Sequence, residues 1–347
     1  MAARRPTLIV TMGDPAGIGP EIVARAASHP AARRAARLLI AGDPEVMERA
    51  IARVRSRVRL RPIDPRTCDL REDAPGLPLI ASSEAGWRAI EPGHPTAASG
   101  MMAARAIETA AALAREGRVD GIVTAPLSKT ALQAAGYPYP GHTEFLGALT
   151  GAPETKMLFV TRTFRILLAT VHIALRRVPD ALTIDGLART MEFAAAAMRN
   201  FRWGTNRSVA VLGLNPHAGE GGLFGDEEAR VIAPAIERAR ARGIRAEGPY
   251  PADTFFAQHE GRRDLGAVVA MYHDQGLIPA KSDGIGGAAN VTLGLPFVRS
   301  SVDHGTAFDR AWKGGARAPD PAGLETAIRV GADLATRGKR PLEWTWP

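Results

Sequence analysis

The chain has 347 residues, of which 46% are hydrophobic and 23% charged, with a net charge of +8. This length allows about two domains of ordinary size, and no apolar run approaches the roughly 20 residues that span a bilayer. A single cysteine, Cys68, excludes an internal disulfide and a cysteine-rich metal site, so any metal here needs His and carboxylate ligands. The basic start runs into a strand and a glycine turn rather than a cleavage site, and we expect a cytoplasmic protein.

The basic charge is carried mostly by arginines scattered through alanine-rich segments. The densest run, Arg49 to Arg61, alternates with apolar residues and contains no aromatic side chain that could stack on bases. We interpret it as the solvated surface of a helix and a strand, with a nucleic-acid patch as the alternative. Because the chain uses arginine so often, Lys129 and Lys281 stand out as positions that favour an ammonium group.

The first part of the chain alternates strands with helices, as expected for a parallel sheet covered by helices. Strands are predicted at 7–12, 37–41, 58–63 and 120–124, with helices from 20 onward and at 43–54 and 97–116. The glycine turn at 13–19 (GDPAGIG) lacks the Gly-x-Gly-x-x-Gly fingerprint, so a classical Rossmann unit is not supported. Residues 64–96, which are rich in Pro, Asp and Gly, are predicted to form an irregular segment with short strands. Ser128 predicts a helix N-cap, and Lys129 is either a solvated lysine or a ligand contact.

A loop rich in proline and glycine, 137–141 (YPYPG), delivers His142, Thr143 and Glu144 to a predicted helix start. The free backbone N–H groups and the positive dipole end of a helix favour an anion at such a position. His142 and Thr143 therefore suit a phosphate group. The alternative is that one of these two side chains only caps the helix.

Histidines follow the strands of the second part of the chain. Strands are predicted there at 156–161, 164–171, 207–214 and 267–272, with helices at 178–202 and 226–243. His172, His217 and His273 each come just after one of these strands. Because the carboxyl ends of parallel strands converge on one crevice, three imidazoles here predict a catalytic metal site with an open position. Three independent structural histidines are the alternative.

Seven motifs occur in order over nearly the whole chain. They are GDPAGIGPE (13–21), TAPLSK (124–129), PGHTE (140–144), NPHAGEGG (215–222), YHDQG (272–276), NVTLGLP (290–296) and SVDHGT (301–306). Together they resemble the 4-hydroxythreonine-4-phosphate dehydrogenase family, the PdxA-like proteins of pyridoxal phosphate biosynthesis. Several blocks of five or more residues make the resemblance specific to this family and its close relatives.

The resemblance implies a fold of class α/β, with two α/β/α domains and mostly parallel sheets like those of the isocitrate and isopropylmalate dehydrogenases. We place the first domain at 1–125 plus 300–347. The second domain, at 126–299, would hold most of the metal and substrate site. The resemblance also implies a homodimer whose active site lies at the subunit interface, and neither a nucleic-acid nor a membrane partner.

The resemblance further implies roles for individual residues. The metal ligands would be His172, His217 and His273, with one contributed across the dimer, and the metal would be zinc, magnesium or cobalt. The substrate-binding residues would be His142, Thr143, Lys281, Asn290 and Arg299. Asp253 and Asp274 would line the metal site, which makes Asp253, Asp274 and Lys281 the catalytic candidates. The oxidant would be NAD or NADP, and its contact residues are not identified.

The expected reaction is oxidation of 4-(phosphooxy)-L-threonine to a 3-oxo acid, which decarboxylates to 3-amino-2-oxopropyl phosphate. The segment SDGIGGAA (282–289) departs from the family pattern. A dehydrogenase of 4-phosphothreonate, 4-phosphoerythronate or a cis-dihydrodiol dicarboxylate is therefore kept as an alternative. A metal-dependent hydrolase, with water as the nucleophile, is the alternative from another class of enzyme.

Overall fold

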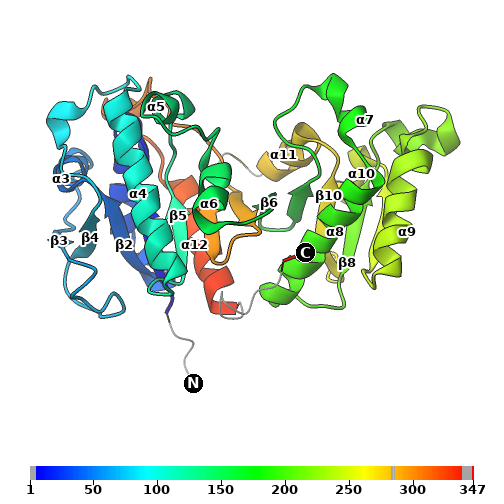
Figure 1. Ribbon diagram of the computed structural model, residues 1–347, viewed down its shortest axis with the longest axis horizontal. Helices are drawn as coiled ribbons and strands as arrows, with labels where there is room; N and C mark the ends of the chain where they lie inside the picture. Colours follow the sequence, from blue (N-terminus) through cyan, green and yellow to red (C-terminus); the bar gives the residue numbers. More distant parts are fainter. Residues whose placement is uncertain (1–4, 283, 285, 338–345) are drawn as a thin grey trace. The chain divides into compact units, whose positions relative to one another are not determined.

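The computed structural model describes residues 5–282, 284, 286–337 and 346–347 (Figure 1). The chain divides into two compact units. Unit 1 contains Met1–Thr155 and Leu295–Arg337, and unit 2 contains Lys156–Gly294 and the end of the chain. The first boundary lies after Thr155 rather than after residue 125, because the helices that follow residue 125 pack against unit 1. The return to unit 1 begins at Leu295, slightly before the expected residue 300.

Unit 1 is built on an all-parallel sheet with the strand order β3-β4-β2-β1-β5-β12. Its strands are β1 (Thr7–Thr11), β2 (Arg37–Gly42), β3 (Leu60–Pro62), β4 (Leu77–Ala81), β5 (Gly121–Thr124) and β12 (Val298–Ser301). The central strand β1 is buried along its whole length, as expected for a parallel strand that is covered on both faces.

Helices cover both faces of this sheet. One face carries α4 (Ala97–Arg115), α5 (Lys129–Ala134) and α6 (His142–Thr150), and α4 crosses in front of the strands in Figure 1. The other face carries α1 (Gly19–Ser28), α2 (Pro30–Ala35), α3 (Pro44–Arg53) and α12 (Ala322–Arg337). Ile9, Leu39 and Ile122, one from each of three adjacent strands, pack in a buried cluster with Ile107 of α4.

Unit 2 has a mixed sheet with the strand order β11-β6-β7-β10-β8-β9. Its strands are β6 (Lys156–Val160), β7 (Arg165–Leu168), β8 (Ser208–Leu212), β9 (Ala246–Tyr250), β10 (Leu265–Ala270) and β11 (Ala289–Leu293). β6 is antiparallel to both of its neighbours, and the other pairs are parallel. Together, the two sheets and their helices confirm the predicted α/β class with mostly parallel sheets.

Helices also cover both faces of the second sheet. One face carries α8 (Ile184–Asn200) and α9 (Ala233–Ala241), and the other carries α10 (Ala252–Gln258) and α11 (His273–Lys281). The single helix predicted at 178–202 is instead two helices, α7 (Val178–Ala181) and α8. The break occurs because Thr183 accepts a hydrogen bond from Gly186 N at 3.0 Å and so starts a new helix.

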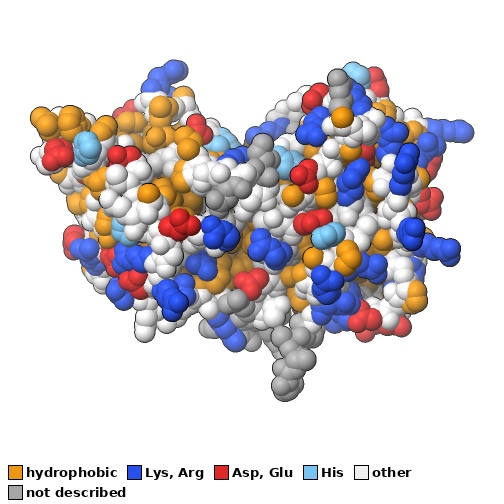
Figure 2. All heavy atoms as spheres, turned by 180° about the vertical axis from the view of Figure 1, so that it is seen from behind, with side chains coloured by type: hydrophobic (Ala, Val, Ile, Leu, Met, Phe, Trp, Pro, Cys, Tyr) orange, Lys and Arg blue, Asp and Glu red, His pale blue; other side chains and the backbone are white. Residues whose placement is uncertain are grey.

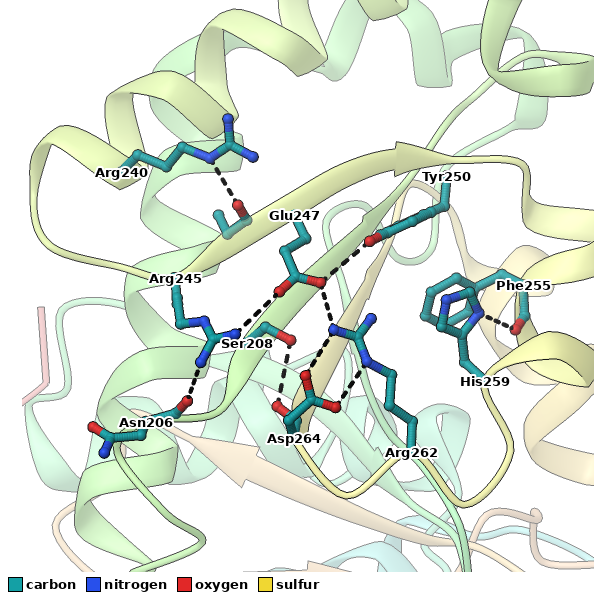
Figure 3. A network of polar contacts seen from close by, with 11 residues as sticks. Asn206, Ser208, Arg240, Arg245, Glu247, Tyr250, Phe255, His259, Arg262 and Asp264 are labelled. Carbon is teal, nitrogen blue, oxygen red and sulfur yellow. Dashed lines mark hydrogen bonds and ion pairs between the residues drawn. The ribbon is translucent and has the colours of Figure 1, made fainter.

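The amino ends of β8, β9 and β10 are joined by a network of charged side chains (Figure 3). Arg262 donates to Glu247 at 2.8 Å and to both oxygens of Asp264 at 2.9 Å. Burial raises the pKa of Glu247, but the hydrogen bond and charge of Arg262 and the hydrogen bonds of Tyr250 and Ser208 together outweigh burial and hold the pKa below its ordinary value of 4.5. Hydrogen bonding to Arg262 also holds the pKa of Asp264 below 3.8.

We expect Arg262→Ala to lower the free energy of unfolding by about 1–3 kcal/mol at pH 7, because Glu247 would lose a charged hydrogen-bond donor while still partly buried. Carboxylates with a lowered folded-state pKa stabilise the fold above the unfolded-state pKa, and this contribution disappears as pH falls through the folded-state pKa. The difference between wild type and variant should therefore be constant above about pH 5.5 and shrink below about pH 4.5. Denaturant unfolding at pH 7 and pH 4 measures both values.

Arg162→Ala is the matched control for this experiment. Arg162 pairs with Glu260 at 3.4 Å on the exposed surface, and such a pair is worth less than about 1 kcal/mol. An equal loss of stability in Arg262→Ala at both pH values would contradict the electrostatic explanation.

Candidate active site

Arg299 lies in the interior of unit 1, on β12 and next to β5. Its side chain is buried, with 2% of its surface exposed, and Nη2 donates to Thr124 Oγ1 at 2.7 Å. Burial lowers the pKa of Arg299 to about 9, and the Glu144 carboxylate opposes this shift. A guanidinium held in such surroundings favours an anionic ligand, because a buried cation is costly without negative charge close by.

His142 lies within electrostatic reach of Arg299 in the same unit. It is the first residue of α6, and Gly141 occupies the N-cap position without a side-chain cap. The alternative that His142 or Thr143 caps this helix is therefore wrong. Burial, reinforced by the positive charge of Arg299, lowers the pKa of His142 well below its usual range, so the ring is neutral at pH 7. Its buried Nε2 has no hydrogen-bond partner among the described residues.

The glycine turn at 13–19 is a structural part of unit 1. Gly13 has a φ of +73°, and a Cβ there would lie 2.4 Å from the carbonyl oxygen of Pro126. Asp14 Oδ1 accepts from Ala16 N at 2.9 Å, and its backbone N–H donates to Pro126 O at 2.9 Å. The turn thus fixes the segment that follows β5, which carries Ser128.

Two of the predicted metal ligands lie together in unit 2. His172 follows β7 and His273 follows β10, and these strands are parallel neighbours. The ring centroids of the two histidines are 5.7 Å apart, with 43° between their planes. His273 Nδ1 lies 2.7 Å from Asp274 Oδ1, an arrangement in which a carboxylate orients the imidazole and leaves Nε2 for a metal. Both histidines line a cleft of about 260 Å³ with Tyr272 and Asp274.

The third predicted ligand, His217, lines a second cleft of about 710 Å³ in the same unit. Asp253 also lines this cleft, and Tyr272 and Asp274 border both clefts. Within the part of the chain that the structure describes, no three His, Cys, Asp or Glu side chains gather closely enough to hold a metal ion. Lys281 ends α11 and Asn290 lies on β11, and neither lines these two clefts.

The backbone that carries His217 is left-handed. His217, Ala218 and Glu220 have φ values of 53°, 52° and 43°, and Gly219 and Gly221 between them are also positive. This conformation costs roughly 1–2 kcal/mol for each residue that has a Cβ. Strained backbone of this kind concentrates at functional sites. The sequence could not reveal the strain, because it shows only that the loop is rich in glycine.

Two side chains that the sequence did not single out hold the strand ends in register. Thr170 Oγ1 donates to Met271 O at 2.7 Å and so ties the end of β7 to the end of β10. Gln275 accepts from Met271 N at 2.7 Å and donates to Gly213 O at 2.7 Å, which joins β10 to β8. The sequence offered one indication of their role, which is that each lies two positions from a predicted metal ligand, Thr170 from His172 and Gln275 from His273.

Two arginines of the Arg49–Arg61 run have partners inside unit 1. Arg49 pairs with Glu45 at 3.2 Å, and Arg53 donates to Trp312 O at 2.5 Å. On the face shown in Figure 2, many Lys and Arg side chains lie among Asp and Glu side chains. These contacts favour the interpretation of the run as a solvated surface. Among the described residues, no helix is long and apolar enough to cross a membrane.

Comparisons with known proteins agree with this geometry. A family model described as pyridoxal phosphate biosynthetic protein PdxA matches residues 34–330. A 4-hydroxythreonine-4-phosphate dehydrogenase of Geobacter metallireducens is 44% identical, over 96% of this chain and 97% of the relative. A D-threonate 4-phosphate dehydrogenase of Cupriavidus necator is 43% identical, over 96% and 98%. The crystal structure of 4-hydroxythreonine-4-phosphate dehydrogenase from Klebsiella pneumoniae has a TM-score of 0.86 at 40% identity, over 97% of this chain and 100% of that chain.

Proposed function

Because the chain belongs to the PdxA family of pyridoxal phosphate biosynthetic proteins, as its seven motifs predicted, we propose that it is a 4-hydroxythreonine-4-phosphate dehydrogenase. It oxidises 4-(phosphooxy)-L-threonine with NAD or NADP, and the 3-oxo acid product decarboxylates to 3-amino-2-oxopropyl phosphate. The observation that carries the metal-dependent part of this proposal is the pair of imidazoles, His172 and His273, at the ends of adjacent parallel strands.

The residues present fit a divalent metal. Of the three expected ions, zinc and cobalt suit imidazole ligands, whereas magnesium prefers oxygen ligands. Two imidazoles that share a small cation, at about 2.0–2.1 Å from each nitrogen, have ring centroids about 5–6 Å apart. The observed separation of 5.7 Å agrees with this value. When bound, the metal would supply Lewis acidity that lowers the pKa of the substrate hydroxyl. We propose His217 as the third ligand and assign it to the partner subunit, since it lines a different cleft from His172.

Exposed apolar side chains support a homodimer with the histidines at its interface. Among the described residues, the large hydrophobic side chains that are 44–73% exposed are Ile173, Leu175, Leu223, Phe224 and Ile278. All five belong to unit 2 and lie within seven residues of His172, His217 or His273. Apolar side chains exposed beside a polar site mark protein interfaces. A partner that covers them would also exclude water from the reaction.

The chain's own side chains supply binding and proton transfer. We propose that Arg299 and the neutral His142 ring, with its proton on Nε2, donate hydrogen bonds to an anionic group of the substrate. Thr143 and the free N–H groups of the first turn of α6 are proposed to bind the same group. Lys281 and Asn290 are proposed as further substrate-binding residues. Each charge-assisted contact is worth about 1.5–3 kcal/mol.

The two carboxylates of the larger cleft suit proton transfer from the substrate hydroxyl. Asp253 lines this cleft with His217, and Asp274 lines both clefts. We propose that Asp274, or Asp253 of the chain that supplies His217, accepts the proton as hydride leaves to the nicotinamide. Lys281 is proposed to return a proton to carbon after carbon dioxide is lost. The second carboxylate, Asp274, also orients His273.

A substrate panel followed at 340 nm, with and without a chelator, tests the proposed function. We expect the highest kcat/KM with 4-(phosphooxy)-L-threonine, and loss of activity with the chelator. D-threonate 4-phosphate is the specific competitor because a relative that acts on it is 43% identical. A higher kcat/KM with D-threonate 4-phosphate than with 4-(phosphooxy)-L-threonine would show that the proposed substrate is wrong. Hydrolysis without any NAD(P)H formation would favour the hydrolase alternative.

Mixed dimers test the assignment of ligands to subunits. In a hybrid of His172→Ala and His217→Ala chains, one of the two sites keeps all three imidazoles if His217 comes from the partner, so activity should reappear in about half of the sites. The matched control is a hybrid of His172→Ala and His273→Ala chains. His172 and His273 are paired within one chain, so neither site of that hybrid is complete and no activity is expected.

Native mass spectrometry of the same samples establishes that the hybrids have formed. Recovery in the control hybrid, or none in the first hybrid, would contradict the assignment of His217 to the partner.

A further inference from the structure

The loop that carries His217 is wrapped around the carboxylate of Glu228. This side chain is buried, with 6% of its surface exposed. Its Oε1 accepts from Leu214 N at 2.7 Å and from Asn215 N at 2.8 Å, and its Oε2 accepts from Asn215 Nδ2 at 2.9 Å. Among the described residues, no Lys, Arg or His forms an ion pair with Glu228. The charge is therefore stabilised by hydrogen-bond donors of the loop.

Two glycines let the loop approach this carboxylate closely. A Cβ on Gly213 would lie 3.1 Å from Glu228 Oε1, and a Cβ on Gly219 would lie 2.8 Å from Oε2. Gly219 belongs to the left-handed stretch that begins at His217. The carboxylate thus contacts the loop both before and after His217, and these contacts oppose relaxation of the strained backbone between them.

Glu228 is itself placed by an unusual element. It opens a π-helical turn, Glu228–Ile232 (η4), that precedes α9. π-helical turns are rare and occur frequently at functional sites. The neighbouring Glu227 differs from Glu228: from the residues that the structure describes it accepts one hydrogen bond, from Asn215 Nδ2 at 2.7 Å, and its side chain is half-buried.

We infer that Glu228 is a positioning residue that holds the His217 loop in the conformation needed for metal binding, without contacting the metal or the substrate. The inference rests on the proposed role of His217 as a metal ligand. An ionised carboxylate accepts hydrogen bonds on both oxygens, whereas an amide accepts on one and donates from the other. Glu228→Gln therefore directs an N–H group toward at least one donor of the loop.

The test is a Co²⁺ titration of the dimer, followed by the visible absorption of the bound ion. We expect Glu228→Gln to weaken Co²⁺ binding by about 10–100-fold, the usual effect of losing a group that orients a ligand. The matched control is Glu227→Gln, which removes the same charge from the adjacent position. A glutamine oxygen can still accept the one hydrogen bond at Glu227, so we expect its Kd to stay within about threefold of the wild-type value.

The same substitution in a His217→Ala chain distinguishes a specific effect of Glu228 on His217 from general destabilisation of the fold. In a His217→Ala chain, adding Glu228→Gln should leave the Co²⁺ Kd unchanged, because the residue through which Glu228 acts is already absent. An equal loss of affinity in both backgrounds would overturn the inference, and so would wild-type affinity in Glu228→Gln. If wild type itself does not bind Co²⁺, the proposed function fails instead.

Glu228→Asp covers the case in which the glutamine variant does not fold. It keeps the charge but is one methylene shorter, so the carboxylate retracts from Leu214 N and Asn215 N. We expect weaker Co²⁺ binding here too, again only when His217 is present. A folded aspartate variant with wild-type affinity would overturn the inference.

Discussion

Replacing His172 or His273 with alanine is expected to reduce kcat by about 10³-fold or more while the protein remains folded. Lewis-acid stabilisation by a metal is worth several kcal/mol, and each 1.36 kcal/mol corresponds to a factor of ten in rate. His172 is exposed, and the side chain of His273 is 36% exposed, so truncation of either ring leaves no large cavity in the core. Steady-state NAD(P)H formation and thermal melting measure the two effects.

The matched control for these variants is His94→Ala. His94 is an exposed histidine of unit 1 that pairs with Glu91 at 3.3 Å, and its loss should change neither kcat nor the melting temperature appreciably. Near-normal turnover of His172→Ala or His273→Ala at low metal concentration would remove that residue from the set of ligands. A large fall in melting temperature would instead indicate a structural role.

Arg299→Lys is expected to raise the KM for the phosphorylated substrate by about 10–100-fold although the charge is retained. A lysine cannot reproduce the planar fork that binds an anion through two hydrogen bonds while a third donor reaches Thr124. Charge-assisted hydrogen bonds of about 1.5–3 kcal/mol correspond to that range. The kinetics of wild type and variant at pH 7.5 measure the effect, and Arg162→Lys at an exposed surface position is the control.

The pH dependence gives an independent check on Arg299. Because burial lowers its pKa to about 9, the free enzyme loses this positive charge as pH rises through about 9, and KM should increase there. In Arg299→Lys the same burial acts on an ammonium with a lower ordinary pKa, so the increase should begin at lower pH. An unchanged KM in the variant, or KM values independent of pH up to 10, would show that Arg299 does not bind the substrate.

Local signals in the sequence were sufficient where a residue acts on its near neighbours. Ser128 accepts from Ala131 N at 3.1 Å, so the predicted helix cap is confirmed, and Asp43 caps the helix that follows it in the same way, by accepting from Val46 N at 3.2 Å. The run TLIVT forms a fully buried strand, as its apolar pattern predicted. These features depend on side chains within three or four positions, which the order of residues specifies directly.

Elements with mixed composition were not predicted, because packing decides them. α11 contains Gly276 and Pro279, which oppose a helix, yet Leu277 and Ala280 are buried in the core of unit 2. β12 carries Arg299 in its interior, where a charged side chain argues against a buried strand. In both cases burial in the tertiary structure outweighs local propensity.

The sequence by itself determined the family, the α/β class and the placement of three histidines after strands. Only the tertiary structure decided which of these histidines lie close to one another. His172 and His273 are close because β7 and β10 are adjacent, and Thr170 bonds to Met271 across 101 positions of the chain. Strand order is set by which faces bury the most apolar surface, and alternation along the chain does not encode it. The loop that carries His217 is likewise contacted by a residue distant in the chain, because Leu214 N and Asn215 N donate to Glu228, 14 and 13 positions away.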